Sequence, residues 1–181
     1  MGVKDNAVVL DACCGSKMFW FDRNNEDVIF SDIRKERHVL CDGRILRIEP
    51  DVQMDFTNLD FPDGRFKLVV FDPPHMDSLG KNSWMALKYG VLGNNWKEVI
   101  KDGFNECFRV LETYGVLVFK WSDVDIKVRE IIKLSPIPPL FGHRTMINNR
   151  TIWLCFMKPA GGMTWEIRQM LSKHLRNIKQ A

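Results

Sequence analysis

The sequence predicts an α/β fold with a mostly parallel, twisted sheet and helices on both faces, because short apolar runs alternate with amphipathic stretches. Six apolar runs have the length and residue types of strands: 7–12, 28–32, 52–55, 66–71, 116–121 and 151–157. The run at 66–71 (FKLVVF) is the strongest of them. The last run is β-branched and aromatic, and we expect it to close the sheet.

Two stretches between these runs have the period of a helix. From Trp96 to Leu111, apolar residues recur at steps of three and four, and Asn95 followed by Glu98 predicts a capping box at the start. The pattern repeats through Val124, Val128, Ile131 and Ile132. Here Ser122 is the expected N-cap and Pro136 lies beyond the end.

The composition is typical of a single globular domain. The 181 residues are 45% hydrophobic and 27% charged, and they contain neither a membrane-length apolar run nor a signal-peptide pattern, so we expect a cytoplasmic protein that makes no membrane contact. Five cysteines without a CxxC pair predict reduced thiols and no metal site, and His38 with Cys41 is interpreted as structural. We place one domain at 1–158 and a basic amphipathic C-terminal helix at 159–181.

That C-terminal segment has both a charged and an apolar pattern. Four bases face one acid between 164 and 181: Arg168, Lys173, Arg176 and Lys179 against Glu166. Its apolar stripe is Ile167, Leu171, Leu175 and Ile178. A solvated helix face and contact with a polyanion are both compatible with this pattern.

Acidic residues end four successive predicted strands: Asp11, Asp32, Asp55 and Asp72. The carboxyl ends of parallel strands form the edge where α/β proteins bind ligands. Asp32 lies 17 residues after Gly15, close to the spacing of about 20 at which a carboxylate binds ribose hydroxyls. The turn Asp11-Ala12-Cys13-Cys14-Gly15 is then the expected place where backbone approaches a cofactor.

The chemistry of that cofactor follows from what the turn lacks. A GxGxxG fingerprint would need glycines where Cys13 and Met18 stand, and no P-loop occurs, so nicotinamide and flavin dinucleotides are disfavoured. Carboxylates suit a positively charged nucleoside without phosphates. S-adenosylmethionine, with its sulfonium, amino acid tail, ribose diol and adenine, is such a ligand.

Four segments carry a resemblance to a known family: LDACCGSKMFWF at 10–21, VVFDPPH at 69–75, FRVLETYGVLVFKW at 108–121 and PLFGHR at 139–144. Over 7–158 the chain resembles Rossmann-like class I S-adenosylmethionine-dependent methyltransferases. Asp72-Pro73-Pro74-His75 resembles the [DNS]PP[YFWH] motif of enzymes that methylate amino nitrogens. More narrowly, the chain resembles small DNA methyltransferases of phages and mobile elements.

The resemblance implies roles for the residues at the strand ends. Asp11 would lie near the methionine amino group, with Ala12, Cys13 and Gly15 forming the cofactor turn. Asp32 would bind the ribose, Ile33 would pack on the adenine, and Asp55 with Phe56 would hold the adenine amine. The usual DxGxG pattern has Cys13 at its first glycine and Lys17 near a later one.

The same resemblance makes Asp72, Pro73, Pro74 and His75 the catalytic residues. The Asp72 carboxylate and the Pro73 carbonyl would accept hydrogen bonds from a planar amine, and His75 would stack on the base. Two prolines hold that carbonyl in an extended turn. A plain strand-ending turn and a structural histidine are the alternatives.

The segment 76–95 lacks a clear period and mixes bases with aromatics. We expect a substrate-binding loop with Lys81, Trp84 and Lys88, or else a surface lid. Phe19-Trp20-Phe21 is expected to be packing behind the cofactor turn, with substrate stacking as the alternative, and His143-Arg144 either contacts phosphate or ends a strand.

The favoured function is methylation of an exocyclic amino nitrogen, with adenine N6 in DNA first. The alternatives are cytosine N4, an RNA base or a protein amide, and a cofactor-binding or nucleic-acid-binding module without turnover. Only 23 residues follow Lys158, too few for a separate recognition domain, so a protein partner is one possible source of target specificity.

Overall fold

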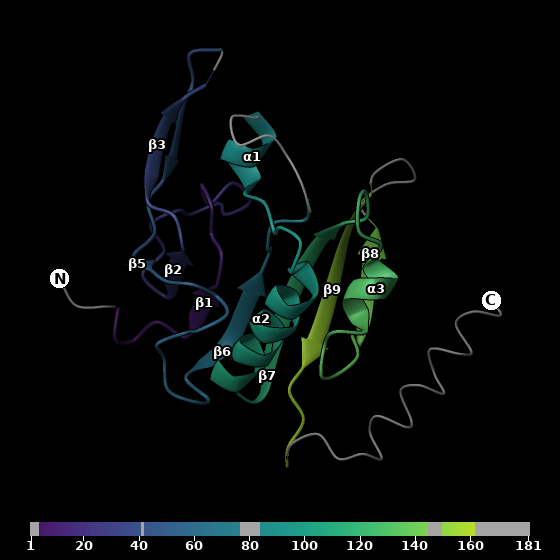
Figure 1. Ribbon diagram of the computed structural model, residues 1–181. Coiled ribbons are helices and arrows are strands. Elements are labelled where there is room, and N and C mark those ends of the chain that lie inside the picture. Colours follow the sequence, from purple (N-terminus) through teal and green to yellow (C-terminus); the bar gives the residue numbers. More distant parts are fainter. Residues whose placement is uncertain (1–3, 41, 77–83, 145–149, 162–181) are drawn as a thin grey trace.

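The computed structural model describes residues 4–40, 42–76, 84–144 and 150–161. Within them the chain forms a seven-stranded sheet with the order β5-β2-β1-β6-β7-β9-β8 (Figure 1). The strands are β1 (Val9–Asp11), β2 (Val28–Asp32), β5 (Val52–Gln53), β6 (Phe66–Phe71), β7 (Leu111–Ser122), β8 (Phe141–Arg144) and β9 (Thr151–Met157). The five strands from β5 to β7 pair in parallel, whereas β9 is antiparallel to both β7 and β8.

The order of the strands creates a switch point between β1 and β6. From β1 the chain proceeds outward to β2 and then β5, and from β6 it proceeds the other way to β7. Connections therefore diverge at the carboxyl ends of β1 and β6, which opens a crevice there. Asp11 ends β1 and Asp72 directly follows β6, so both lie at this edge.

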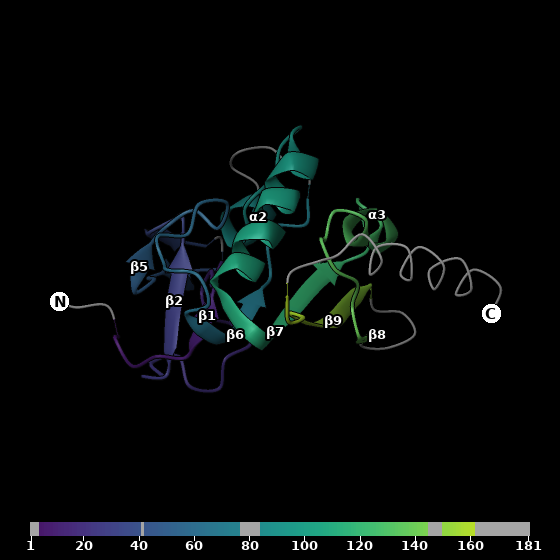
Figure 2. The same ribbon diagram turned by 90° about the horizontal axis from the view of Figure 1, so that it is seen from below.

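The two longer connections on the β6 side place helices on one face of the sheet. Helix α2 (Trp96–Val110) joins β6 to β7, and α3 (Val128–Ile132) follows β7. Both lie on the same side of the strands in Figures 1 and 2. The main core forms beneath them around buried aromatic rings from both layers: Phe66, Phe71, Phe104, Phe119, Trp121 and Phe156.

The opposite face is covered differently. The sequence predicted helices on both faces, but in the described residues the connection from β1 to β2 is an irregular loop, residues 12–27. Trp20 from this loop packs edge-on against Phe30 of β2, with 5.1 Å between ring centroids, and joins a second cluster with Cys14 and Val28. One aromatic side chain thus does part of the covering that a helix would do.

A β-hairpin stands in the connection between β2 and β5. Its strands, β3 (Glu36–Val39) and β4 (Ile45–Ile48), pair with each other and with no strand of the main sheet. The hairpin rises beyond the carboxyl edge of the sheet, next to the short helix α1 (Trp84–Tyr89) (Figure 1). The hairpin was not predicted from the sequence, because each of its strands has only four residues.

Most of the predicted elements are confirmed, and the strands at 28–32, 66–71 and 151–157 match residue for residue. Asn95 is the N-cap residue of α2 as predicted, but its side chain makes no capping hydrogen bond. The predicted cap at Ser122 is wrong, because Ser122 still belongs to β7. Helix α3 instead begins after Lys127, where the Asp123 carboxylate accepts a hydrogen bond from the Val128 amide at 2.7 Å. No described helix is both long and apolar enough to cross a membrane.

Candidate cofactor and substrate site

A pocket lies at the switch point, where the carboxyl ends of β1, β2 and β6 meet. It is lined by residues from the loop after β1, the end of β2, the segment after β6 and helix α1: Cys13, Cys14, Gly15, Ser16, Met18, Phe19, Asp32, Ile33, Arg34, Phe56, Asp72, Pro74, Lys88 and Tyr89. Seven of the predicted cofactor and catalytic residues line this pocket: Cys13, Gly15, Asp32, Ile33, Phe56, Asp72 and Pro74. Predicted cofactor residues and the predicted catalytic carboxylate therefore share one pocket.

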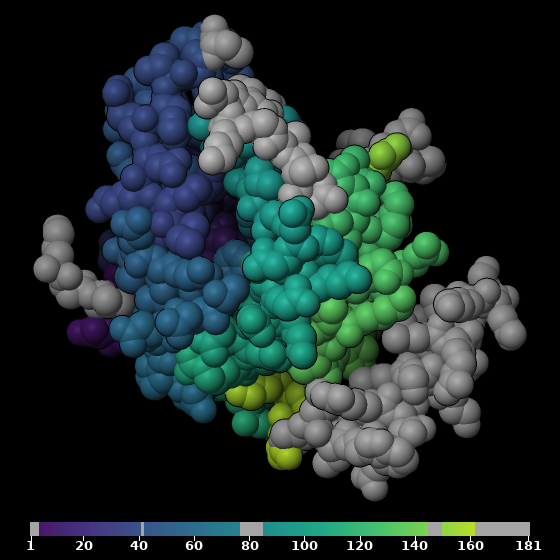
Figure 3. All heavy atoms as spheres, viewed as in Figure 1, coloured from purple at the N-terminus to yellow at the C-terminus, as the bar shows by residue number. Residues whose placement is uncertain are grey.

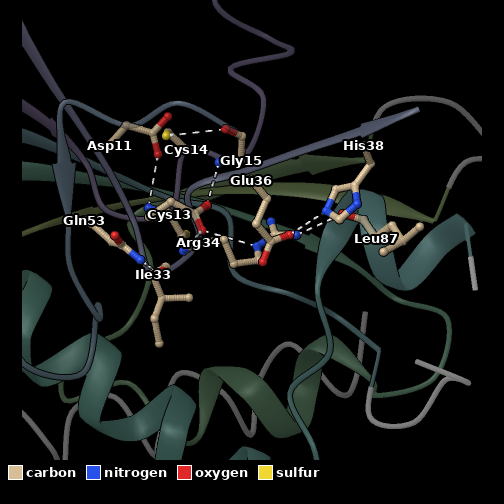
Figure 4. Close-up of polar contacts among 11 residues, drawn as sticks. Asp11, Cys13, Cys14, Gly15, Ile33, Arg34, Glu36, His38, Gln53 and Leu87 are labelled. Carbon is tan, nitrogen blue, oxygen red and sulfur yellow. Dashed lines mark hydrogen bonds and ion pairs between the residues drawn. The ribbon is translucent and has the colours of Figure 1, made fainter. Parts of the chain in front are cut away.

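Gly15 and Asp32 are joined by a hydrogen bond across the pocket floor (Figure 4). The Gly15 amide donates to Asp32 Oδ2 at 2.8 Å, and Gly15 has a φ of +51°, in the left-handed region that favours glycine. No heavy atom lies within 4 Å of the place where a Cβ would be, so the space in front of Gly15 is open. The backbone there can approach a ligand closely.

Asp32 is nearly buried and well held, but it keeps acceptor capacity. Its Oδ1 accepts from the Arg34 amide at 2.9 Å and from Arg34 Nε at 3.3 Å. A carboxylate has about four acceptor sites, so three donors leave room for a ligand hydroxyl. Arg34 also donates through Nη1 to the Leu87 carbonyl at 3.0 Å, which ties the end of β2 to α1 (Figure 4).

Two apolar side chains form walls beside Asp32. Ile33 exposes 56% of its surface although its neighbours in β2 are buried, and its backbone carbonyl accepts a hydrogen bond from Gln53 Nε2 at 2.9 Å (Figure 4). The Phe56 ring packs edge-on against Phe71, 5.1 Å between centroids. A flat aromatic ligand could bury its faces against these side chains.

Asp11, Ala12 and Asp55 are not among the residues that line the pocket. Asp11 is fully buried and accepts hydrogen bonds from Trp20 Nε1 at 2.7 Å and from the Cys13 amide at 3.3 Å. Burial raises the pKa of Asp11 to about 7, against the lowering effect of these two donors. Ala12 is also buried, and its amide donates to the Val70 carbonyl at 3.0 Å, which joins the cofactor turn to β6.

Asp55 is turned to its own loop. One of its carboxylate oxygens, Oδ1, accepts from the Thr57 amide at 2.9 Å and from Thr57 Oγ1 at 2.8 Å. The predicted strand 52–55 ends at Gln53, so Asp55 lies in a turn past the strand, and its neighbour Phe56 reaches the pocket instead. The family resemblance implies an adenine contact for both Asp55 and Phe56, but only Phe56 lines the pocket.

Asp72 forms an ion pair with Lys120 of β7. The distance from Lys120 Nζ to Asp72 Oδ2 is 2.5 Å, and both side chains are mostly buried. Burial raises the pKa of Asp72, and the Lys120 ammonium acts in the opposite direction. Oδ1 of Asp72 has no hydrogen bond from the described residues and is the oxygen available to a ligand in the pocket.

Pro73, Pro74 and His75 continue from Asp72 as a segment that is neither helix nor strand. Pro73 is buried, whereas Pro74 lines the pocket. The His75 ring lies beside the pocket, with its centroid 5.7 Å from that of Tyr89 and 6.4 Å from that of Trp121. Burial lowers the pKa of His75, and Asp72 opposes this. Tyr89, which His75 contacts, lines the pocket, whereas His75 is not among the lining residues.

Solved structures with this topology identify the fold. A SAM-dependent methyltransferase from Methanosarcina mazei superposes with a TM-score of 0.51 at 10% identity, over 86% of this chain and 93% of that one. The chain has the class I methyltransferase fold.

Other solved methyltransferases of this fold align at similar length. They include a 1,6-didemethyltoxoflavin N1-methyltransferase from Burkholderia thailandensis, solved with S-adenosylhomocysteine (13% identity, 84% of this chain, 71% of that chain, TM-score 0.49). An rRNA methylase from Streptococcus thermophilus is a further example (12% identity, 86% and 88%, TM-score 0.46). No family model and no curated protein matches the sequence.

The structure describes two of the three predicted substrate-binding residues. Lys81 lies outside the described residues, and Trp84 is the first residue of α1. Lys88 lines the pocket, and its ammonium lies 4.9 Å from the centroid of the Tyr89 ring. The segment predicted as a loop thus contains a short helix that brings Lys88 and Tyr89 to the pocket.

The aromatic run after the cofactor turn divides into three environments. Phe19 lines the pocket and packs edge-on against Trp153 of β9 at 5.7 Å. Trp20 packs on the far face as predicted, and Phe21 is fully exposed. The interpretation as packing is therefore confirmed for Trp20, whereas Phe19 is a pocket residue.

Sequence reasoning missed two residues with clear roles: Arg34, which lines the pocket, and Lys120, which forms an ion pair with Asp72. Lys120 was hidden because it interrupts an apolar strand, and a single lysine in such a run carries no motif. Only the register of the folded sheet reveals its role, since Lys120 follows Phe119, which pairs with Phe71 next to Asp72. Arg144 of β8 binds Asp123 at 3.0 Å, so it serves to tie β8 to the end of β7.

The described residues contain no cluster of three or more metal-ligating side chains. Four thiols are free there, and burial raises the pKa of each: Cys13, Cys14, Cys107 and Cys155. Thiols with raised pKa values are poor nucleophiles at neutral pH. His38 contacts Glu36 at 2.8 Å, in accord with a structural role.

Proposed function

We propose that this protein is an S-adenosylmethionine-dependent methyltransferase that acts on an exocyclic amino nitrogen of a nucleobase, with adenine N6 in DNA as the favoured target. The observation that carries the proposal is the shared pocket. Gly15, Asp32 and Ile33 line one part of it, and Asp72 and Pro74 of the DPPH motif line another. Binding and transfer would then occur within one enclosure.

The first part of the pocket fits the cofactor by its donor and acceptor types. Asp32 would accept from the ribose hydroxyls, because it retains acceptor sites after binding Gly15 and Arg34. Ile33 and Phe56 would hold the adenine between apolar surfaces. The open space at Gly15 would admit the ligand to the backbone. When bound, S-adenosylmethionine supplies a methyl group on an electrophilic sulfonium.

The second part of the pocket fits a planar amine. Oδ1 of Asp72 would accept one N–H of the target amine and the Pro73 carbonyl would accept the other. These hydrogen bonds favour a more tetrahedral nitrogen, whose lone pair is less delocalised into the ring. Positioning of that nitrogen supplies most of the rate, because correct alignment of two reactants can replace several kcal/mol of activation free energy.

Aromatic rings next to Asp72 suit a base. Tyr89 and Phe19 line the pocket from α1 and from the loop after β1. The His75 ring packs against Tyr89, with 5.7 Å between the ring centroids. We therefore propose that Tyr89 stacks on the base and that His75 supports Tyr89. A base would have to leave its duplex to enter, at a cost on the order of a few kcal/mol.

Methyl transfer to labelled substrates tests the proposal. Purified protein is incubated with S-adenosylmethionine labelled in its methyl group and with DNA, RNA and protein, and the labelled atom is identified by mass spectrometry. We expect label on adenine N6 of DNA. Label on cytosine N4, on RNA or on a protein amide would show that the substrate is that group and not adenine in DNA. Cofactor binding without methyl transfer to any of these substrates would support a module without turnover.

The variant Asp72→Ala separates chemistry from binding. It should abolish methyl transfer while calorimetry shows cofactor affinity within a few-fold of the parent. Asp60→Ala, which removes an exposed carboxylate from a loop, is the matched control and should retain activity. Equal activity of Asp72→Ala and Asp60→Ala would exclude the proposed role.

A further inference from the structure

The hairpin β3–β4 bears a surface that its own fold does not require. Arg37 and Arg47 stand directly opposite each other on the two strands, and both are exposed. Like charges at directly opposed positions destabilise a strand pair. Next to them, Val39 and Ile45 are also paired and expose 68% and 46% of their surfaces. Paired cations beside exposed apolar side chains are typical of a ligand-binding surface.

A groove of about 490 Å³ runs between this hairpin, the loop after β1 and helix α1. Its lining contains four basic residues and no acidic residue: Arg23, Arg44, Arg47 and Lys88. The remaining lining is small or apolar: Ser16, Met18, Leu40, Ile45 and Leu46. Arg44 is bound by the exposed Asp42, whose carboxylate accepts from Arg44 Nε at 2.7 Å, so its charge is partly compensated.

The groove adjoins the pocket that contains Asp72. Ser16, Met18 and Lys88 line both. Lys88 and Met18 thus stand at the boundary, and a chain molecule in the groove would continue into the pocket. Figure 3 shows the hairpin projecting at the upper left of the molecule, where a long ligand could lie against it.

We propose that this groove binds the phosphodiester backbone of a single-stranded polynucleotide next to the nucleotide whose base enters the pocket. This rests on the proposed function and assigns its substrate class. The cofactor has no phosphate, so the basic lining is not explained by it. Guanidinium groups bind phosphate oxygens through paired hydrogen bonds, and the apolar side chains give bases a surface to lie on.

The test measures oligonucleotide binding by fluorescence anisotropy over a range of salt concentrations. The variant Arg23→Gln/Arg47→Gln removes two groove charges. The control Lys101→Gln/Arg129→Gln removes two exposed charges from α2 and α3, away from the groove. Because both variants change the net charge equally, any difference between them reports the location of the charges.

We expect the groove variant to bind single-stranded DNA or RNA roughly ten-fold more weakly, since an exposed charge contact contributes a few-fold. The log–log salt slope should become shallower by about 1.4, the value for two phosphates of a single strand. The control should keep the parent's slope. Cofactor affinity measured by calorimetry should be equal in all three proteins, which shows that the fold is intact.

Two results would overturn the groove proposal. One is equal affinity and slope in the groove variant and its control. Another is binding of adenosine monophosphate as tight as that of the oligonucleotide, because the groove would then hold a mononucleotide. If cofactor binding or transfer fails while oligonucleotide binding still depends on Arg23 and Arg47, the proposed function is wrong and the groove assignment holds. DNA and RNA of the same sequence, compared side by side, identify the sugar.

Discussion

Lys120 Nζ lies 2.5 Å from Oδ2 of Asp72, across the adjacent strands β6 and β7. The parallel register that pairs Phe71 with Phe119 places the two residues side by side at the pocket edge. The ammonium also lies 5.7 Å from the Phe19 ring and 5.8 Å from the Trp153 ring. Lys120 therefore occupies one carboxylate oxygen and leaves the other free, which fixes the orientation of Asp72.

Replacement of Lys120 by Met should shift the acid limb of the pH–rate profile to higher pH. Burial already raises the pKa of Asp72 and Lys120 opposes that effect, so without the ammonium the pKa rises further. A protonated Asp72 has lost acceptor capacity for an amine, and activity at a given acidic pH falls accordingly. The pH dependence of kcat/KM for Lys120→Met measures the shift.

Titration of the Asp72 carboxylate measures the same change in its pKa without an activity assay. The ¹³Cγ resonance of Asp72, followed by NMR against pH in the free protein, should titrate at higher pH in Lys120→Met. Lys120→Arg keeps the charge and should stay near the parent. If the resonance titrates identically in all three proteins, Lys120 does not control the ionisation of Asp72.

Asp32→Ala should weaken the binding of S-adenosylmethionine and S-adenosylhomocysteine by about 10- to 150-fold, as expected for the loss of charge-assisted hydrogen bonds worth about 1.5–3 kcal/mol. The variant also removes the acceptor of the Gly15 amide, which in the parent donates to Asp32 Oδ2 at 2.8 Å. Calorimetry measures the change, with NAD as a ligand that should bind neither protein. Parent-like affinity in Asp32→Ala would remove Asp32 from the cofactor site.

The buried Asp11 should make the protein less stable as pH rises from about 4 to 7. Its pKa is about 7 in the folded state against 3.8 as the ordinary value, so in this window the folded state binds a proton that the unfolded state has released. The free energy of unfolding therefore decreases as the pH rises through this window, by up to about 1.4 kcal/mol per pH unit.

Asp11→Asn, which does not titrate, isolates this contribution. The free energy of unfolding in urea, parent minus variant, should fall across that pH window and level off above it. Asn also changes the hydrogen bonds to Trp20 and Cys13, but this offset does not depend on pH. A difference that is constant with pH would show that Asp11 is ionised throughout.

Local patterns were sufficient for the sheet but not for the pocket. The strands at 28–32 and 66–71 could be read directly because they are apolar and end in acids. Asp55 shows where this fails. It follows a strand of only two residues, and the Thr57 hydroxyl and amide draw its carboxylate into the turn. A hydrogen bond within three residues thus decided which way the side chain points.

Residues that depend on long-range pairing could not be predicted. Lys120 meets Asp72 through the strand register, and Arg34 is held at the pocket by its contact with α1, and neither relationship leaves a mark on the neighbouring sequence. The hairpin was missed for another reason. Each of its strands has only four residues, and two arginines alternate with Val39 and Ile45 on the exposed face, so the pattern is too short to predict a strand.

Gly103 of helix α2 packs against two aromatic rings, Phe71 and Phe56, and Phe56 lines the pocket. A Cβ on this residue would lie 2.7 Å from Cζ of Phe71 and 2.8 Å from Cδ2 of Phe56. Alanine in a helix gains about 1 kcal/mol over glycine, but forced overpacking costs about 1–3 kcal/mol. We expect Gly103→Ala to be net destabilising in urea, whereas Asp102→Ala, on the exposed side of the same helix, should be neutral or stabilising.

The same substitution should weaken cofactor binding, because Phe56, one of the two rings that the new Cβ would displace, is a wall of the pocket. A second change tests this cause. Phe56→Leu makes room for the new methyl group, so Gly103→Ala should cost less stability in the Phe56→Leu background than in the parent. If the two effects are additive, the Cβ is accommodated elsewhere, and α2 does not hold Phe56 against the cofactor.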